Sequence, residues 1–206
     1  MEGGYQPYYE DELIGLVAYA KSLIPEYTRL QRIQRDIPAK LIVAGSKHSN
    51  FRQLARERLE ADGGRCRCIR CREIGRLPSA GIPEIQVLQY DACGGKEHFI
   101  SAVSDDSLIG FARLRVPSSV YRAELENAAL MRELHVYGSL VPVGRDANAE
   151  EWQHRKYGKL LLLRSEDIAR DAGFRKLAIM SGIGVRPYYR RLGYERRGPY
   201  MIRELS

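Results

Sequence analysis

The chain has 206 residues, 44% of them hydrophobic and 29% charged, which suffices to bury one large domain or one domain with a smaller appendage. This composition excludes collagen, coiled-coil and disordered classes, and no run of about 18 apolar residues predicts a transmembrane helix. The net charge of +7 favours a polyanionic partner such as nucleic acid or a phosphate-rich cofactor, although an inert basic surface explains it as well.

The N-terminal residues are acidic and polar, unlike a secretory signal peptide, so the sequence predicts a cytoplasmic protein. Apolar residues recur at helical spacing from Leu13 to Leu23, and Pro25 ends this predicted helix. From 29 to 35 we expect a second helix, because Arg29, Arg32 and Arg35 stand three apart and would share one basic face.

The segment before the cysteines contains two further expected elements. Residues 41–44 are a candidate buried strand, which ends at Gly45. A helix is predicted at about 51–60, with Ser49 or Asn50 as its cap and Gly63-Gly64 after its end.

Three of the four cysteines, Cys66, Cys68 and Cys71, form a C-x-C-x-x-C cluster. Thiolates at this spacing can converge on one tetrahedral metal, and zinc is favoured because an iron–sulfur cubane normally needs four ligands. The sequence does not decide the fourth ligand; the candidates are Cys93, His48, another side chain and water. The alternative is three free thiols in a basic loop.

Arginines crowd around this cluster and suggest a second role for it. A dense cationic loop would favour the thiolate forms and could bind a phosphate backbone, whereas the alternative is a solvated charged loop. The arginines around the cluster are Arg65, Arg67, Arg70, Arg72 and Arg76.

From residue 82 the pattern changes to strands. Three runs separated by turn residues predict an antiparallel meander, and further strands and helices follow. The expected strands are 82–90, 96–103, 108–115, 129–137, 176–180 and 196–202, and the expected helices are 153–172 and 185–192, with a loop at 139–152.

The predicted helix at 153 follows a strand that ends at Gly138. A helix N-terminus reached in this way presents unpaired backbone N–H groups, and these can bind a pyrophosphate. Further along, Tyr189, Gly193 and Tyr194 form a Tyr-x-x-x-Gly-aromatic motif on a short helix. In an acyl-CoA transferase a phenol can protonate the departing thiolate, although core packing is the commoner role of a tyrosine.

Together these motifs resemble a GNAT acetyltransferase, and more narrowly the catalytic subunit of Elongator, the tRNA uridine carboxymethyl synthase. The resemblance covers essentially the whole chain. It rests on RIQRDIP at 32–38, RCRCIRCREIG at 65–75, ELHVYG at 133–138 and YYRRLGY at 188–194, followed by GPYM.

The resemblance implies an α+β GNAT fold, with a mixed and mostly antiparallel sheet flanked by helices. It implies three parts: 1–62 as the end of a radical S-adenosylmethionine (SAM) domain, 63–80 as a zinc-binding linker, and 81–206 as the acetyltransferase domain. The family binds tRNA at the anticodon and modifies C5 of the wobble uridine with acetyl-CoA as the carbon source. The zinc ligands would be Cys66, Cys68 and Cys71.

By the same resemblance, Tyr189 would face the thioester sulfur as the general acid, with Tyr188 beside it. Glu133 or His135 could act as a base, unless Glu133 pairs with Arg132 or Arg113. The implied acetyl-CoA contacts are Glu133, Leu134, His135, Val136, Tyr157, Gly158, Lys159 and Tyr189.

Two departures from the family pattern bear on function. No cysteine precedes Cys66, so the family's [4Fe–4S] cluster and SAM are not supported by this chain. Radical chemistry would then need a radical SAM domain or Elongator-like subunits. Lys156 stands where the GNAT helix normally has glycine. Two alternatives remain, a conventional lysine or amine N-acetyltransferase and a non-catalytic zinc-containing RNA-binding module.

Overall fold

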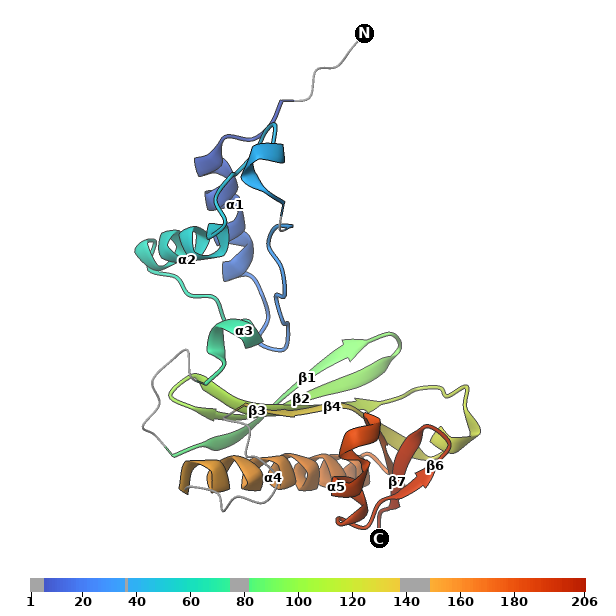
Figure 1. Ribbon diagram of the computed structural model, residues 1–206. Coiled ribbons are helices and arrows are strands. Elements are labelled where there is room, and N and C mark those ends of the chain that lie inside the picture. Colours follow the sequence, from blue (N-terminus) through green and yellow to red (C-terminus); the bar gives the residue numbers. More distant parts are fainter. Residues whose placement is uncertain (1–5, 36, 75–81, 138–148) are drawn as a thin grey trace. The chain divides into compact units, whose positions relative to one another are not determined.

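The computed structural model describes residues 6–35, 37–74, 82–137 and 149–206, with the backbone alone for 149–156. The chain divides into two compact units, Met1–Arg72 and Glu73–Ser206 (Figure 1). Among the helices of the described ranges, none combines the length and the apolar character that crossing a membrane requires.

The N-terminal unit is helical. Its elements are α1 (Glu10–Ser22), the 3-10 helix η1 (Ala39–Leu41), α2 (Phe51–Ala61) and α3 (Ile69–Arg72). The first predicted helix is present but begins at Glu10, three residues before the apolar run, because acidic residues fill its first turn and the Glu12 carboxylate accepts the Tyr9 N–H at 2.9 Å. The second helix buries Phe51, Ala55 and Leu59, which are spaced four residues apart on one face.

The predicted basic helix at 29–35 is wrong, because this segment is irregular. The carbonyls that a helix would use accept side-chain donors instead. The Leu30 carbonyl accepts from Arg52 at 3.0 Å, and the Gln31 carbonyl accepts from Arg70 at 3.0 Å. Arg29, Arg32 and Arg35 are exposed on this irregular segment.

The predicted buried strand at 41–44 is also wrong. Leu41 ends η1 and is 63% exposed, and Val43 is 98% exposed. No strand is described in the N-terminal unit, so this short apolar run has no ladder to join.

The C-terminal unit is built on one seven-stranded sheet with strand order β1-β2-β3-β4-β5-β7-β6. Only the β4–β5 pairing is parallel, which confirms the predicted mixed, mostly antiparallel GNAT sheet. The strands are β1 (Glu84–Ala92), β2 (Gly95–Ser104), β3 (Ser107–Val116), β4 (Ala128–Val136), β5 (Lys176–Met180), β6 (Glu195–Arg197) and β7 (Tyr200–Glu204).

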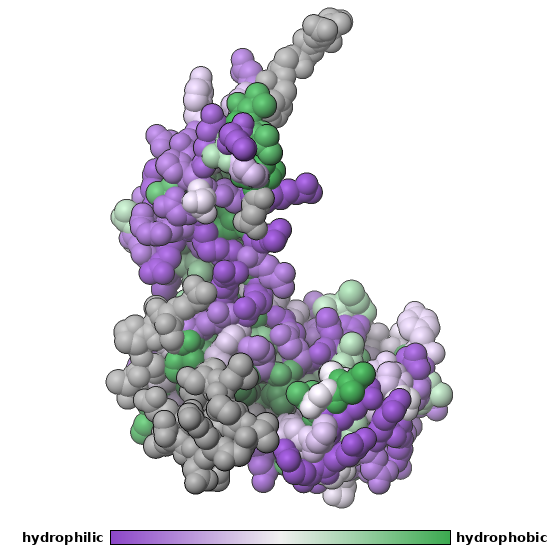
Figure 2. Space-filling model, in the orientation of Figure 1, coloured by the Kyte–Doolittle hydropathy of each residue, from purple (hydrophilic) through white to green (hydrophobic). Residues whose placement is uncertain are grey.

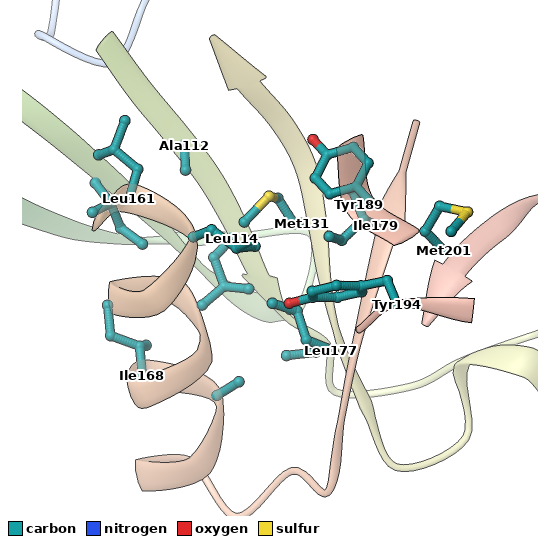
Figure 3. Close-up of a cluster of buried hydrophobic side chains, with 14 residues drawn as sticks. Ala112, Leu114, Met131, Leu161, Ile168, Leu177, Ile179, Tyr189, Tyr194 and Met201 are labelled. Carbon is teal, nitrogen blue, oxygen red and sulfur yellow. The ribbon is translucent and has the colours of Figure 1, made fainter. Parts of the chain in front are cut away.

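Helices α4 (Ala149–Asp171) and α5 (Arg186–Arg190) cover one face of this sheet (Figure 1), while short 3-10 turns lie at Ala123–Leu125 (η2) and Ile183–Val185 (η3). The main core lies between α4, α5 and the sheet (Figure 3). Leu161 and Leu162 of α4 and Met131 of β4 are buried in it together with Tyr189 and Tyr194.

Two predicted boundaries in this unit are corrected. The long helix begins at Ala149 rather than 153, because Ala149, Glu150 and Glu151 are good helix formers although they show no apolar periodicity. The last predicted strand, 196–202, is instead two strands, β6 and β7. They are separated by Gly198, whose φ of +57° allows the turn, and by Pro199. Gly138 and most of the predicted loop, up to residue 148, lie outside the described residues, as does Arg76.

Candidate functional site

The strands β4 and β5 pair over a short stretch and then separate. The last parallel pair joins Met131 to Ile179, whereas β4 continues to Val136. The outer edges of the two strands remain paired: Val136 pairs with Gly110 of β3, and Met180 pairs with Tyr200 of β7. Among the described residues, no strand pairs with the inner edge of β4 beyond Met131, so β4 and β5 form a fork in the sheet.

A bulge marks the point where the fork begins. In β4, Met131 pairs with Leu114 and Glu133 pairs with Arg113, so Arg132 is one residue in excess of its partner strand. Met131 belongs to the α4 side of the core and Leu134 packs against that core, so Arg132 and Glu133 both point to the opposite face.

The backbone beyond the bulge has free polar groups on the open side. The Tyr137 N–H donates to the Ile109 carbonyl of β3 at 2.7 Å. Because backbone polar groups alternate along a strand, those of Leu134 and Val136 point away from β3 and into the fork. A ligand with amide groups could pair with them.

Tyr189 lies where the fork begins. Its ring belongs to the same cluster as Met131 and Ile179, the last strand pair, and its hydroxyl points away from Tyr194 (Figure 3). Burial, with a smaller contribution from Tyr188, raises the pKa of Tyr189 to about 12. The hydroxyl therefore stays protonated at neutral pH and can act as a proton donor.

Tyr188 packs edge-on against Tyr189, with ring centroids 5.2 Å apart. A Cβ added at Gly158 of α4 would lie 3.4 Å from the Tyr188 hydroxyl and 3.6 Å from Val136 Cγ2, so the helix, the tyrosine and the strand converge here. Burial also raises the pKa of Tyr188.

The segment after β5 holds three of the eight buried side-chain polar atoms that have no hydrogen-bond partner in the described part of the chain. These three are Ser181 Oγ, Arg186 Nε and the Tyr188 hydroxyl, all within residues 181–188. Unsatisfied buried groups are costly, so their concentration in one segment indicates a polar ligand. The sequence pattern did not single out Ser181 or Arg186, and no periodic signal marks them.

The remaining predicted site residues fall into distinct places. Glu133 accepts a hydrogen bond from Arg113 Nε at 2.9 Å, so the arginine-paired alternative is the one observed. His135 is exposed, and its ring lies 4.5 Å from that of Tyr137. Tyr157 is half-buried and Lys159 is exposed, both in the third turn of α4 rather than at its N-terminus. The Lys156 side chain lies outside the described side chains.

The three clustered cysteines come together in the N-terminal unit. Their sulfur atoms all lie within 4.8 Å of one another, and Cys68 is completely buried. Hydrogen bonds from the thiols of Cys66 and Cys71 lower the pKa of Cys68, whereas hydrogen bonds with Cys68 and Cys71, together with burial, raise the pKa of Cys66. Three sulfurs this close can hold a metal ion. His48 instead lies 3.2 Å from Glu10 and is outside the group, and Cys93 is exposed in the β1–β2 turn of the C-terminal unit.

A buried lysine completes the surroundings of the cluster. Lys21 is 1% exposed, and its Nζ donates to Cys71 Sγ at 3.8 Å. Sequence reasoning missed this residue. The available signal was its position three residues after the buried Ala18, on the inward face of α1.

Three of the arginines around the cluster, Arg67, Arg70 and Arg72, hold the loop in place, a role that neither phosphate binding nor a solvated charged loop had predicted. Arg72 is buried and donates to Glu26 at 3.0 Å, and Arg67 also pairs with Glu26. Arg70 donates to the Gln31 carbonyl, and the Ile69 N–H donates to that of Thr28 at 3.0 Å. The loop is thereby fixed to the segment 26–31.

Comparison with known proteins finds two family models. Residues 1–61 match the radical SAM C-terminal domain, and residues 72–194 match the acetyltransferase (GNAT) family. A protein named tRNA uridine(34) acetyltransferase from Methanocaldococcus jannaschii is 47% identical over 99% of this chain and 40% of its own length. Elongator complex protein 3 of Homo sapiens is 42% identical over 99% of this chain and 39% of its own length.

A solved structure agrees with these sequence matches. Elp3 of the archaeon Methanocaldococcus infernus, with an N-terminal deletion, superposes with a TM-score of 0.87 and 44% identity. The match covers 98% of this chain and 50% of that chain. The resemblance expected from the motifs is confirmed, and the chain spans about two-fifths of the length of the curated relatives that it matches.

Proposed function

The chain belongs to the acetyltransferase (GNAT) family, and from this membership we propose that it is the acetyl-CoA-dependent acyltransferase part of an enzyme that modifies the wobble uridine of tRNA. The observation that carries the proposal is the fork between β4 and β5 with Tyr189 at its base. The names of the relatives supply the tRNA substrate, and the C5 position and the carboxymethyl product follow from the family resemblance.

In this proposal acetyl-CoA enters the fork and pairs with the free backbone groups of Leu134 and Val136. Tyr189 donates its proton to the sulfur as the C–S bond breaks, so that CoA leaves as a neutral thiol. In the hydrolysis expected of this part alone, the hydroxyl of a water molecule adds to the acetyl carbon to give acetic acid, and the remaining proton of that water returns to Tyr189. Tyr188 stands beside it and contributes the second hydroxyl. Tyr157, Gly158 and Lys159 line the cofactor on the α4 side, and Glu133 and His135 lie on the opposite face of β4.

A substitution at Gly158 tests this binding mode. Gly158→Val would place methyl groups against the Tyr188 hydroxyl and Val136, within the space that the cofactor needs. We expect acetyl-CoA affinity, measured by calorimetry, to fall about tenfold or more. Leu163→Val is the matched control, since it puts the same β-branched residue at a 40% exposed position of α4. Equal affinity of the Gly158 variant and the control would contradict the binding mode.

For the cysteine cluster we propose Zn²⁺ held by Cys66, Cys68 and Cys71. The sulfurs fit, because two thiolates on one tetrahedral zinc stand about 3.8 Å apart at a Zn–S distance of about 2.3 Å. Zinc would supply a structural cross-link that orders the loop, and cytoplasmic conditions would keep the thiols reduced.

We propose that tRNA contacts the exposed arginines Arg29, Arg32 and Arg35. The visible face of the N-terminal unit is mainly hydrophilic (Figure 2), as expected for an electrostatic contact surface. The domain division proposed for the chain is 1–62, 63–80 and 81–206. Radical generation is assigned to a [4Fe–4S] cluster and SAM held outside these 206 residues, in a radical SAM domain or an Elongator-like assembly.

The salt dependence of tRNA binding tests the arginine assignment. Replacing Arg29, Arg32 and Arg35 by Gln should reduce the slope of log K against log salt by about 2 to 3, roughly one per lost phosphate contact. The control replaces Arg56 and Arg58 of α2, which already pair with Glu60 and Asp62 at 2.6 and 3.1 Å. An unchanged slope in the triple variant would remove this segment from the interface.

The two alternatives predict different behaviour in the same assays. A conventional amine N-acetyltransferase would acetylate a peptide without tRNA, and a decayed RNA-binding module would give no heat with acetyl-CoA. The similarity to the curated relatives extends over 99% of the chain, the cysteine loop included, and favours the tRNA enzyme over both.

A further inference from the structure

The bulge that opens the fork is attached to a buried carboxylate on a distant strand. Glu97 of β2 is 1% exposed, and its Oε1 accepts from Arg132 Nη1 at 2.6 Å and from Arg115 Nη1 at 3.2 Å. Arg132 is the extra residue of β4, so this ion pair acts directly on the bulge.

Arg115 fixes the position of Glu97. Besides the carboxylate, Arg115 donates to the carbonyls of Ala92 and Cys93 in the β1–β2 turn, each at 3.0 Å. Arg115 and Glu97 also face each other as a strand pair of β2 and β3. The carboxylate is therefore anchored to the hairpin, and Arg132 is the member of the trio that lies on β4.

A second ion pair holds the other residue of the bulge. Glu133 pairs with Arg113 Nε at 2.9 Å, and Arg113 also lies 5.4 Å from the ring centroids of Phe99 and Phe111. Both bulge side chains are thus held on the face opposite α4. With Arg132 released, the bulge would keep only the Glu133 contact.

We propose that Glu97 is a positioning residue, which holds the Arg132 bulge and thereby keeps the Leu134 and Val136 backbone groups directed into the fork. The proposal rests on the proposed acetyl-CoA function of the fork. Loss of the Glu97 charge would also leave two guanidinium groups facing each other without a counter-charge, which disfavours the bulged arrangement.

The two arginines of this trio provide a matched pair of variants. Arg132→Met removes the contact on the bulge, whereas Arg115→Met removes an equivalent contact to the same carboxylate from β3. We expect acetyl-CoA to bind about tenfold more weakly to Arg132→Met and Glu97→Gln, and only about threefold more weakly to Arg115→Met, which loosens the carboxylate but keeps its contact with the bulge. Arg132→Lys, which keeps the charge, should restore most of the affinity.

Hydrogen exchange of the full chain without acetyl-CoA supplies a readout that is independent of the ligand. The Tyr137 amide, which bonds to β3, should exchange faster in Arg132→Met and Glu97→Gln than in Arg115→Met. If both arginine variants behave alike in affinity and exchange, the inference is overturned. If the parent binds no acetyl-CoA, the proposed function fails, and the exchange comparison still decides the role of Glu97.

Discussion

Tyr189→Phe is expected to slow thioester cleavage of acetyl-CoA by about 100-fold or more while acetyl-CoA affinity stays within about twofold. The ring packs against Met131 and Ile179, and phenylalanine keeps that packing, so only the proton donor is removed. Product thiol release in single turnover gives the rate, and calorimetry gives the affinity.

The pH dependence of the same reaction adds an independent criterion. Because the pKa of Tyr189 is raised to about 12, its proton is retained from pH 6 to 10, and this residue causes no loss of rate there. The rate should fall only as the pH approaches 12, and the phenylalanine variant should lack that decline.

Tyr194→Phe is the control, because it removes a tyrosine hydroxyl that is hydrogen-bonded within the core. Tyr194 donates to the buried Glu166 carboxylate at 2.6 Å, so its loss should lower stability and leave the cleavage rate near that of the parent. Equal slowing by both variants would indicate a packing effect rather than proton donation by Tyr189.

Cys68→Ser is expected to abolish metal binding, from about one zinc per chain to almost none, and to loosen the N-terminal unit. Cys68 is completely buried at the centre of the cluster, and a serine oxygen can still accept the backbone hydrogen bonds that reach the thiolate. Loss of order would therefore reflect the missing metal. On the order of 10 kcal/mol of apparent binding free energy is involved for structural zinc near neutral pH.

Elemental analysis and limited proteolysis of the N-terminal unit measure these two effects. Cys93→Ser is the matched control, since Cys93 is exposed in the β1–β2 turn and outside the cluster. Its metal content and proteolysis pattern should equal those of the parent. Full metal content in Cys68→Ser would refute the ligand assignment.

The sequence predicted the β1–β3 meander well, because alternating apolar residues and short turns report strand pairing between neighbours in the chain. The hairpin turns fall at Cys93-Gly94 and Asp105-Asp106, where positive φ angles fit two-residue turns. The helix predicted from the arginine spacing at 29–35 is wrong, because the spacing does not show that distant side chains donate hydrogen bonds to the carbonyls of this segment. The early start of α4 was missed because its first turns carry no apolar stripe.

For the site, the motif residues Val136, Gly158 and Tyr188 are brought together by the fold. The roles of Glu97, Arg132 and Lys21 could not be predicted. The bulge at Arg132 is recognised only when β3 and β4 are aligned, and the buried ion pairs of Glu97 are recognised only when β2, β3 and β4 are placed together. From residue type alone, each of them would be expected to be an ordinary charged residue on the surface.

The outer edges of the fork have an energetic consequence for ligand binding. β3 supports one arm as far as Val136, and β7 supports the other as far as Met180, so neither arm depends on a ligand for its hydrogen bonds. The fork is preorganised: the conformational entropy of its strands is lost when the chain folds and not when a ligand binds. The shape of the fork is then set by β3 and β7, the strands that flank it, before any ligand binds.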